Sequence, residues 1–242
     1  MNGTITRKLL VVGGSGFLGL NVCKLAVQRG WETVSLSRRG EPASFQQKGK
    51  PEWAEKVHWA SGNSLEPSSY EDLLPGVTDV VHSVGILMET NNNGSAVTFE
   101  MMNRDTAITV SNEVAKLPSI KSFVYISASE ISPLVNQRYY TSKREAEDYL
   151  FKQESFKTVA LRPGLMYNSS KPFLAPIVAL LKLAKMVTSP FKEGIERMPG
   201  GKMFTVSPLE TEQVAKAVIA SIETAEQGVF DVEDIEKLSQ KF

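Results

Sequence analysis

A tyrosine and a lysine four residues apart could carry out proton transfer. Tyr139 and Lys143 bound the segment Tyr139-Tyr140-Thr141-Ser142-Lys143, which we expect to open a helix, and this spacing places both side chains on one helix face. A phenol with its ordinary pKa of about 10 is a poor general acid–base at neutral pH. A nearby ammonium stabilises the phenolate, so we expect Lys143 to lower the pKa of Tyr139 and fit it for acid–base catalysis.

A glycine-rich turn near the N-terminus could bind a dinucleotide. The apolar run at 9–12 predicts a buried strand, and the apolar spacing that follows predicts a helix over 17–29. Glycines in such a turn let the backbone approach a pyrophosphate, and the N–H groups of the helix N-terminus face its negative charge. A plain structural turn is the alternative. The sequence predicts a pyrophosphate cradle made by Gly13, Gly14, Ser15, Gly16, Phe17, Leu18 and Gly19.

The end of the second predicted strand indicates which dinucleotide binds. A site for NAD usually has a carboxylate there, whereas this chain has Ser37, Arg38 and Arg39. Guanidinium groups pair with a 2′-phosphate, so we expect NADP(H) to be preferred and NAD(H) to be possible. The alternative is that the two arginines belong to a solvated loop. Lys143 would also bond the nicotinamide ribose.

Two further turns are expected to pass the cofactor. Asn63 and Ser64 follow the third predicted strand, where the amide of Asn63 could bond an adenine edge. The fourth strand ends in a small-residue turn made by Ser83, Val84 and Gly85. His82, at the end of that strand, is expected to be structural rather than catalytic.

Strand-like and helical segments alternate along much of the chain. Strands are predicted over 8–12, 32–37, 56–60, 79–83, 122–127 and 158–162, and helices over 17–29, 67–74, 98–116 and 138–153. This alternation predicts an α/β fold with a Rossmann-type doubly wound parallel sheet. We expect residues 1–164 to form the nucleotide-binding domain. Residues 165–242 would form a small substrate-side lobe packed on it, with helices over 173–187 and 211–223 and a strand over 228–232; surface loops are expected over 40–51 and 90–95, and irregular structure over 190–202.

Together these motifs resemble the short-chain dehydrogenase/reductase superfamily, of the extended or atypical kind. The glycine turn, the Tyr139/Lys143 pair, Asn103 in the helix after strand four and the turn after strand six stand in that family's order. The resemblance implies a proton-relay role for Asn103 and places Pro163, Gly164 and Met166 beside the nicotinamide. The serine that usually partners the tyrosine is replaced by Ala128. Ser127 or Ser129 could take its place, or the site lacks that substrate-binding hydroxyl.

Four segments resemble one group within the superfamily more closely. They are residues 80–87, 99–103, 125–128 and 142–147, and they are similar to the fungal mitochondrial member associated with ubiquinone biosynthesis, which is related to the accessory Rossmann subunit of respiratory complex I. The resemblance implies a mitochondrial location on the matrix side of the inner membrane. It also implies contact with other coenzyme Q biosynthesis proteins.

Composition excludes several other classes of protein. The formal net charge of the 242 residues is zero, so bulk charge does not indicate nucleic-acid binding. Cys23 is the only cysteine, and His58 and His82 lack ligand spacing, so we expect no disulfide and no metal site. No segment is long and apolar enough for a transmembrane span. The first eight residues are too short for a secretory signal, and the sequence does not show whether an organelle presequence has been removed.

Three functions fit these features. The first is an NADPH-dependent oxidoreductase that acts on a prenylated quinone or its precursor. The second is a nucleotide-binding assembly or regulatory subunit with little catalysis, which the alanine at position 128 favours. The third is a nucleotide-sugar epimerase or dehydratase, which the small C-terminal lobe disfavours. The helix over 173–187 could line a greasy pocket or rest peripherally on a membrane, or it could simply pack on the core.

Overall fold

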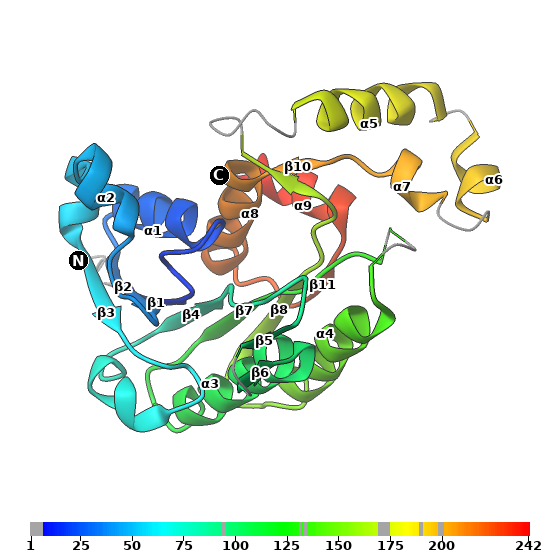
Figure 1. Ribbon diagram of the computed structural model, residues 1–242. Helices are drawn as coiled ribbons and strands as arrows, with labels where there is room; N and C mark the ends of the chain where they lie inside the picture. The colour runs from blue at the N-terminus through cyan, green and yellow to red at the C-terminus, as the bar shows by residue number, and fades with distance from the viewer. Residues whose placement is uncertain are drawn as a thin grey trace.

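Seven parallel strands form one sheet in the structure, a computed structural model that describes residues 7–92, 95–130, 132, 135–168, 175–188, 191–197 and 201–242 (Figure 1). The chain runs from β1 to β3 in one direction and then crosses to β4 and continues to β11 in the other. The predicted Rossmann-type doubly wound fold is confirmed. Its direction reverses between β1 and β4, where such sheets bind ligands. The strand order is β11 (Gly228–Phe230), β8 (Lys157–Leu161), β7 (Ser122–Ile126), β4 (Asp79–His82), β1 (Lys8–Val12), β2 (Glu32–Ser37) and β3 (Val57–Ser61).

Helices cover both faces of the sheet (Figure 1). Leu9 and Val11 face one core together with α1 (Gly19–Gln28), α8 (Thr211–Glu223) and α9 (Val232–Ser239). Leu10 and Val12 face the other core together with α3 (Thr106–Val114) and α4 (Gln137–Leu150). Adjacent residues of β1 therefore serve opposite cores, and this continuous apolar run is what a strand buried on both faces requires.

Local signals fix the ends of the helices around the site. Gly30, with a φ of +74°, ends α1, and its N–H donates to the carbonyl of Val27 at 2.9 Å. Such a backbone conformation favours glycine. Asn136 caps the start of α4 by accepting from the N–H of Arg138 at 2.9 Å. This cap fixes where α4 begins and so sets the position of Tyr139, which lies in the first turn of that helix.

The helix predicted over 98–116 contains an irregularity. Its first part is a π-helical turn, η4 (Glu100–Asp105), and regular α-helix begins only at Thr106. Wide turns of this kind are common at functional sites. The turn carries Asn103, whose side chain is fully buried.

Several expected loops contain regular structure. Residues 90–95 contribute to an antiparallel pair formed by β5 (Thr90–Asn92) and β6 (Ser95–Val97), and residues 40–51 contain α2 (Ala43–Lys48). The helix predicted over 67–74 consists of two 3-10 turns, η2 (Pro67–Ser69) and η3 (Glu71–Leu73), and η1 (Glu52–Lys56) precedes β3. These elements are short, and short polar segments carry little periodicity from which to predict them.

The C-terminal region is divided between the sheet and a smaller lobe. The lobe contains β9 (Met166–Tyr167), α5 (Ala175–Thr188), α6 (Lys192–Glu196), α7 (Lys202–Thr205) and β10 (Leu209–Glu210), and Figure 1 shows α5, α6 and α7 standing away from the sheet. β9 pairs with β10. The structure differs here from the expected division at residue 164, because β11 extends the main sheet beside β8 and α8 covers that sheet.

The described part of the lobe also corrects the prediction of irregular structure over 190–202, since α6 and the start of α7 lie there. Residues 173–174, expected to begin a helix, lie outside the described residues, and α5 begins at Ala175. Within the described part of the chain, no helix has the length and apolar character needed to cross a membrane.

Candidate active site

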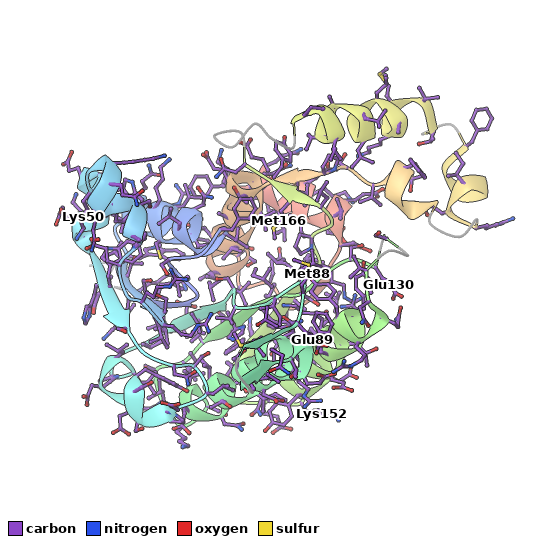
Figure 2. All side chains as sticks on the ribbon, viewed as in Figure 1. Lys50, Met88, Glu89, Glu130, Lys152 and Met166 are labelled. Atoms are coloured by element: carbon purple, nitrogen blue, oxygen red, sulfur yellow. The ribbon has the colours of Figure 1, made fainter. Side chains whose placement is uncertain are left out.

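A cavity of about 720 Å³ opens at the carboxyl ends of the strands, beneath α5. Its walls come from the turns after β4, β7 and β8, from the first turns of α4, and from α5 and the segment after α7. This is the switch point of the sheet, the expected place for a ligand. In Figure 2, Met166 lies at the base of the lobe that carries α5, Met88 lies below Met166, and Glu89 lies at α4, where it pairs with Arg138 at 3.1 Å. The predicted site residues that line the cavity are Phe17, Ser83, Val84, Gly85, Ser127, Ser129, Tyr139, Lys143, Pro163, Gly164 and Met166.

The glycine turn is packed so closely that larger residues do not fit. A Cβ on Gly14 would lie 2.3 Å from Ser35 Oγ, and one on Gly19 would lie 2.2 Å from the carbonyl oxygen of Gly13. Gly13 has a φ of +87°, and its carbonyl accepts from the N–H of Gly16 at 2.9 Å. The turn therefore brings the start of α1 against the ends of the strands.

The start of α1 suits an anion. Its first turn contains no acidic residue, and no side chain caps it. The macrodipole and the backbone N–H groups at this end attract negative charge. Ser15 is partly buried, Gly16 is exposed, and Leu18 is buried in the core. The residues present thus fit a dinucleotide pyrophosphate.

Tyr139 stands at the cavity with its ring edge-on to Phe99, at 6.0 Å between ring centroids, and beside Tyr140 at 5.2 Å. Burial raises the pKa of Tyr139 to about 12; Tyr140 adds to the rise and Arg144 opposes it. The expectation that Lys143 lowers this pKa is wrong for the structure, because the loss of hydration outweighs any nearby positive charge. Tyr139 is therefore protonated at neutral pH.

Lys143 is almost completely buried at the end of β7. Its Nζ donates to the carbonyl of Ile126 at 2.8 Å and lies 4.9 Å from the ring centroid of Tyr125. Burial lowers the pKa of Lys143 to about 7, and the carboxylate of Glu147 partly offsets the lowering. The side chain is thus poised between ammonium and amine near neutral pH.

Gly85 lies between Asn103 and Lys143. A Cβ on Gly85 would come within 2.9 Å of Asn103 Oδ1 and 3.0 Å of Lys143 Nζ. Asn103 Oδ1 accepts from the N–H of Ile86 at 2.8 Å, and its Nδ2 donates to the carbonyl of Ile86 at 3.2 Å. Tyr125 donates its phenol proton to the carbonyl of Asn103. In this structure Asn103 therefore holds the turn after β4, and its proton-relay role stays a prediction.

A buried ion cluster fixes the turn after β7. The sequence analysis did not predict this cluster. Glu147 lies between Arg144, at 2.5 Å from Nη1, and Arg162, whose Nε donates to it at 3.0 Å. Arg144 also donates to Ser127 Oγ at 2.9 Å and to the carbonyl of Ala128 at 2.5 Å. Glu147 stands four residues after Lys143, a spacing that could have indicated a shared helix face.

The two candidate serines, Ser127 and Ser129, differ in their contacts with this cluster. The hydroxyl of Ser127 is buried and bonded to Arg144, whereas Ser129 is partly exposed at the cavity. The backbone N–H of Ser129 donates to the carbonyl of Pro163 at 2.9 Å, which ties the turns after β7 and β8 together. Of the two, Ser129 is therefore the one placed to reach a substrate.

The residues expected near the adenosine half lie outside the cavity. Arg38 and Arg39 are exposed after β2, and neither guanidinium makes an ion pair or hydrogen bond with another described residue. Ser37 donates from Oγ to the carbonyl of Gly40 at 2.8 Å. Both arginines are thus available to an anion.

Asn63 is already engaged locally. Its Nδ2 donates to Glu66 at 2.8 Å, and its Oδ1 accepts from the N–H of Leu65 at 3.2 Å, while Ser64 is buried. The amide would need to exchange these bonds to read an adenine edge, so its predicted role is weakened.

His82 lies in the second core rather than in the cavity. It is fully buried, its ring lies against Phe123 and Tyr125, and neither ring nitrogen has a partner among the described residues. Burial, and then the charge of Lys143, lowers its pKa to about 3. The ring is therefore neutral. Within the described residues, no cluster of three or more His, Cys, Asp or Glu side chains could hold a metal ion.

Comparisons with known proteins agree with this architecture. Residues 9–173 match the family model described as the NAD dependent epimerase/dehydratase family. The chain is 30% identical to MIOREX complex component 2 of Saccharomyces cerevisiae, over 95% of this chain and 99% of that protein.

Two solved structures share the fold at low identity. An oxidoreductase of the short chain dehydrogenase/reductase family from Burkholderia thailandensis has a TM-score of 0.65 at 13% identity, covering 95% of this chain and 92% of the other. UDP-glucuronic acid 4-epimerase from Bacillus cereus, in complex with NAD, has a TM-score of 0.63 at 15% identity, covering 93% and 78%. The family match spans more than half of the chain, so this protein belongs to the NAD dependent epimerase/dehydratase family.

Proposed function

We propose that this protein is an NADPH-binding oxidoreductase of ubiquinone biosynthesis that acts on, or next to, a prenylated quinone intermediate. The observation that carries the proposal is the position of Tyr139 and Lys143 in an apolar cavity at the switch point of the sheet. The glycine turn that could hold a pyrophosphate lies at the same edge, and Phe17 from that turn lines the same cavity.

The choice of NADPH rests on the end of β2. Arg38 and Arg39 are exposed there, and the strand ends on Ser37 instead of a carboxylate. A 2′-phosphate would pair with a guanidinium, and a ribose diol without the phosphate would lack its usual acidic partner. NADP(H) is thus preferred over NAD(H), which remains a possible cofactor.

The site residues would donate a proton and would hold the cofactor and the substrate in position. The bound nicotinamide would supply hydride. Tyr139 holds its proton at neutral pH, so its hydroxyl acts as the general acid toward a substrate carbonyl oxygen. Lys143 would bond the nicotinamide ribose from its buried position at the end of β7, and Ser129 would orient the carbonyl. A protonated phenol favours the reductive direction.

The walls of the cavity indicate an apolar substrate. Among the described residues, Lys143 is the only charged side chain that lines it, and aliphatic or aromatic side chains make up most of the remainder. A nucleotide sugar would bring a diphosphate that needs cationic partners, so the epimerase reading is the weakest of the three. A quinone ring with an isoprenoid tail could place its carbonyl at Tyr139 and its tail along Ile177 and Leu181.

Location and partners are proposed from the relatives. We place the protein in the mitochondrion, on the matrix side of the inner membrane, in contact with other coenzyme Q biosynthesis proteins. The support is the resemblance of four segments to the fungal member of that pathway and the yeast relative, which is described as a component of a complex.

A second candidate is a nucleotide-binding assembly subunit with little catalysis. The observation that favours it is the bond from Arg144 to Ser127 Oγ, which engages one of the two hydroxyls near Ala128. Such a subunit would still gain stability from bound nucleotide.

The replacements Tyr139→Phe, Ser129→Ala and Ser127→Ala distinguish the candidates when turnover of NADPH with a short-chain quinone is measured beside NADPH affinity. An oxidoreductase loses turnover in Tyr139→Phe with unchanged affinity, and Ser129→Ala impairs it more than Ser127→Ala. Unchanged turnover in Tyr139→Phe would reject the role of the phenol. Wild-type protein that binds NADPH and shows no turnover would support the assembly subunit.

A further inference from the structure

The outer side of α5 exposes large apolar side chains. Leu180, Leu183 and Val187 follow each other at helical spacing and are 65%, 54% and 64% exposed. On the other side of the helix Val178 is buried, and Lys185 donates from Nζ to Ser207 Oγ at 2.6 Å. Figure 1 shows this helix at the outer edge of the molecule, away from the sheet. We call the exposed set the α5 face: Ile177, Leu180, Leu183, Met186 and Val187.

The α5 face is continuous with the cavity. Ile177 and Leu180 line the cavity while more than half of each side chain remains exposed. Phe204 of α7 lines it as well and is 44% exposed. Apolar side chains are therefore found both in the cavity that Tyr139 lines and on the exposed side of α5, and Ile177 and Leu180 belong to both. A ligand that is poorly soluble in water could move along these side chains without crossing bulk solvent.

The sequence around the face is basic, although the whole chain is neutral. No acidic residue occurs between Glu154 and Glu193, a stretch that includes all of α5. Such a local excess of positive charge is attracted to anionic headgroups. The basic residues of that stretch nearest α5 in the sequence are Lys171, Lys182, Lys185 and Lys192, of which Lys185 also lies 3.7 Å from a carboxylate oxygen of Glu236. Arg162 pairs with Glu147, and Lys157 bonds the carbonyl of Ala225, so neither adds to the charge near α5.

We propose that the α5 face is a docking surface for an anionic lipid bilayer, through which an apolar substrate enters the cavity. Its side chains are aliphatic except for the thioether of Met186, and it has none of the tryptophan, tyrosine and arginine residues in which the binding energy of protein–protein interfaces is concentrated. A helix that exposes a broad apolar face inserts that face shallowly into a headgroup layer. The entry route rests on the proposed function, whereas bilayer docking can be tested without turnover.

The experiment is flotation of the full chain with phosphatidylcholine vesicles, with and without phosphatidylglycerol, at low and at high salt. The test variant is the triple replacement L180S/L183S/M186S. The matched control is F151S/V229S. It removes two apolar side chains elsewhere on the molecule, and in the wild type these are 36% and 43% exposed. Light scattering gives the oligomeric state of each protein, and circular dichroism shows that each is folded.

The wild type and the control should float with phosphatidylglycerol vesicles, less at high salt, and the triple variant should bind at least about tenfold more weakly, since each lost side chain removes buried apolar area. Tyr139→Phe should float like the wild type, so failure of the catalytic proposal would not imitate failure of docking. Wild-type protein that does not float with anionic vesicles would overturn the inference. So would a triple variant that floats normally, or one whose only change is loss of a self-associated form, since the face would then be a protein interface.

Discussion

Replacing Glu147 by Gln should destabilise the protein strongly, because Glu147 neutralises two arginines in a buried cluster. Its side chain is 3% exposed, and it pairs with Arg144 and Arg162. The glutamine keeps the size of the side chain but removes its charge. Both guanidinium groups then lose their counter-charge, and the turn that Arg144 holds at Ser127 and Ala128 loses its anchor.

The magnitude follows from the burial of each partner. Breaking a fully buried ion pair costs about 3–5 kcal/mol. The side chains of Arg144 and Arg162 are 28% and 31% exposed, so water screens part of the unpaired charge. We therefore expect a loss of about 2–3 kcal/mol. For a chain of this size each kcal/mol lowers Tm by about 2–4 °C, so Tm should fall by about 4–12 °C.

Differential scanning calorimetry of Glu147→Gln and Glu145→Gln measures this effect. Glu145 lies on the same helix and accepts from Arg104 at 2.6 Å, but its side chain is 45% exposed. An exposed pair contributes about 0–1 kcal/mol, so the control should remain within about 4 °C of the wild type. Equal Tm values for the two variants would refute the view that the Glu147 cluster holds this part of the site together.

Three further outcomes are expected. Gly19→Ala should abolish nucleotide binding by calorimetry, because its Cβ would lie 2.2 Å from the carbonyl oxygen of Gly13. Gly194→Ala should bind normally, because no atom of the described residues would lie within 4 Å of its Cβ. The double replacement of Arg38 and Arg39 by Ala should weaken NADPH and leave NADH affinity unchanged; equal losses for both would remove the basis for the NADPH preference. The pKa of Lys143 falls from 10.5 to about 7 on burial, so between these values the unfolded chain binds more protons than the folded one, and stability should rise with pH. Urea titrations from neutral to alkaline pH should show this rise in the wild type and a flatter profile in Lys143→Met.

The parts of the fold that the sequence predicted are those with long, regular patterns. β1 and β2 have the predicted limits, and α8 spans the predicted residues 211–223, because a strand buried on both faces and an amphipathic helix both leave a periodic trace. β11 joins the main sheet although only a short apolar run marks it. Membership of a sheet depends on pairing with β8, a distant partner that local patterns do not encode.

In the candidate site, too, local sequence patterns could be predicted, whereas contacts between distant segments could not. The four-residue spacing predicted that Tyr139 and Lys143 share one helix face, and both side chains line the cavity in the structure. The protonation of these groups could not be predicted, because it depends on desolvation by residues from several strands and helices. The bonding of Ser127 to Arg144 was also hidden, since it depends on how α4 lies against the end of β7.

Calorimetric titration of the folded protein with NADPH and with NADH tests the central claim, that the glycine turn after β1 holds a dinucleotide whose nicotinamide reaches Tyr139. We predict saturable binding of both nucleotides, tighter for NADPH, that is lost in Gly19→Ala and kept in Tyr139→Phe. Wild-type protein that is folded and binds neither nucleotide would contradict the account.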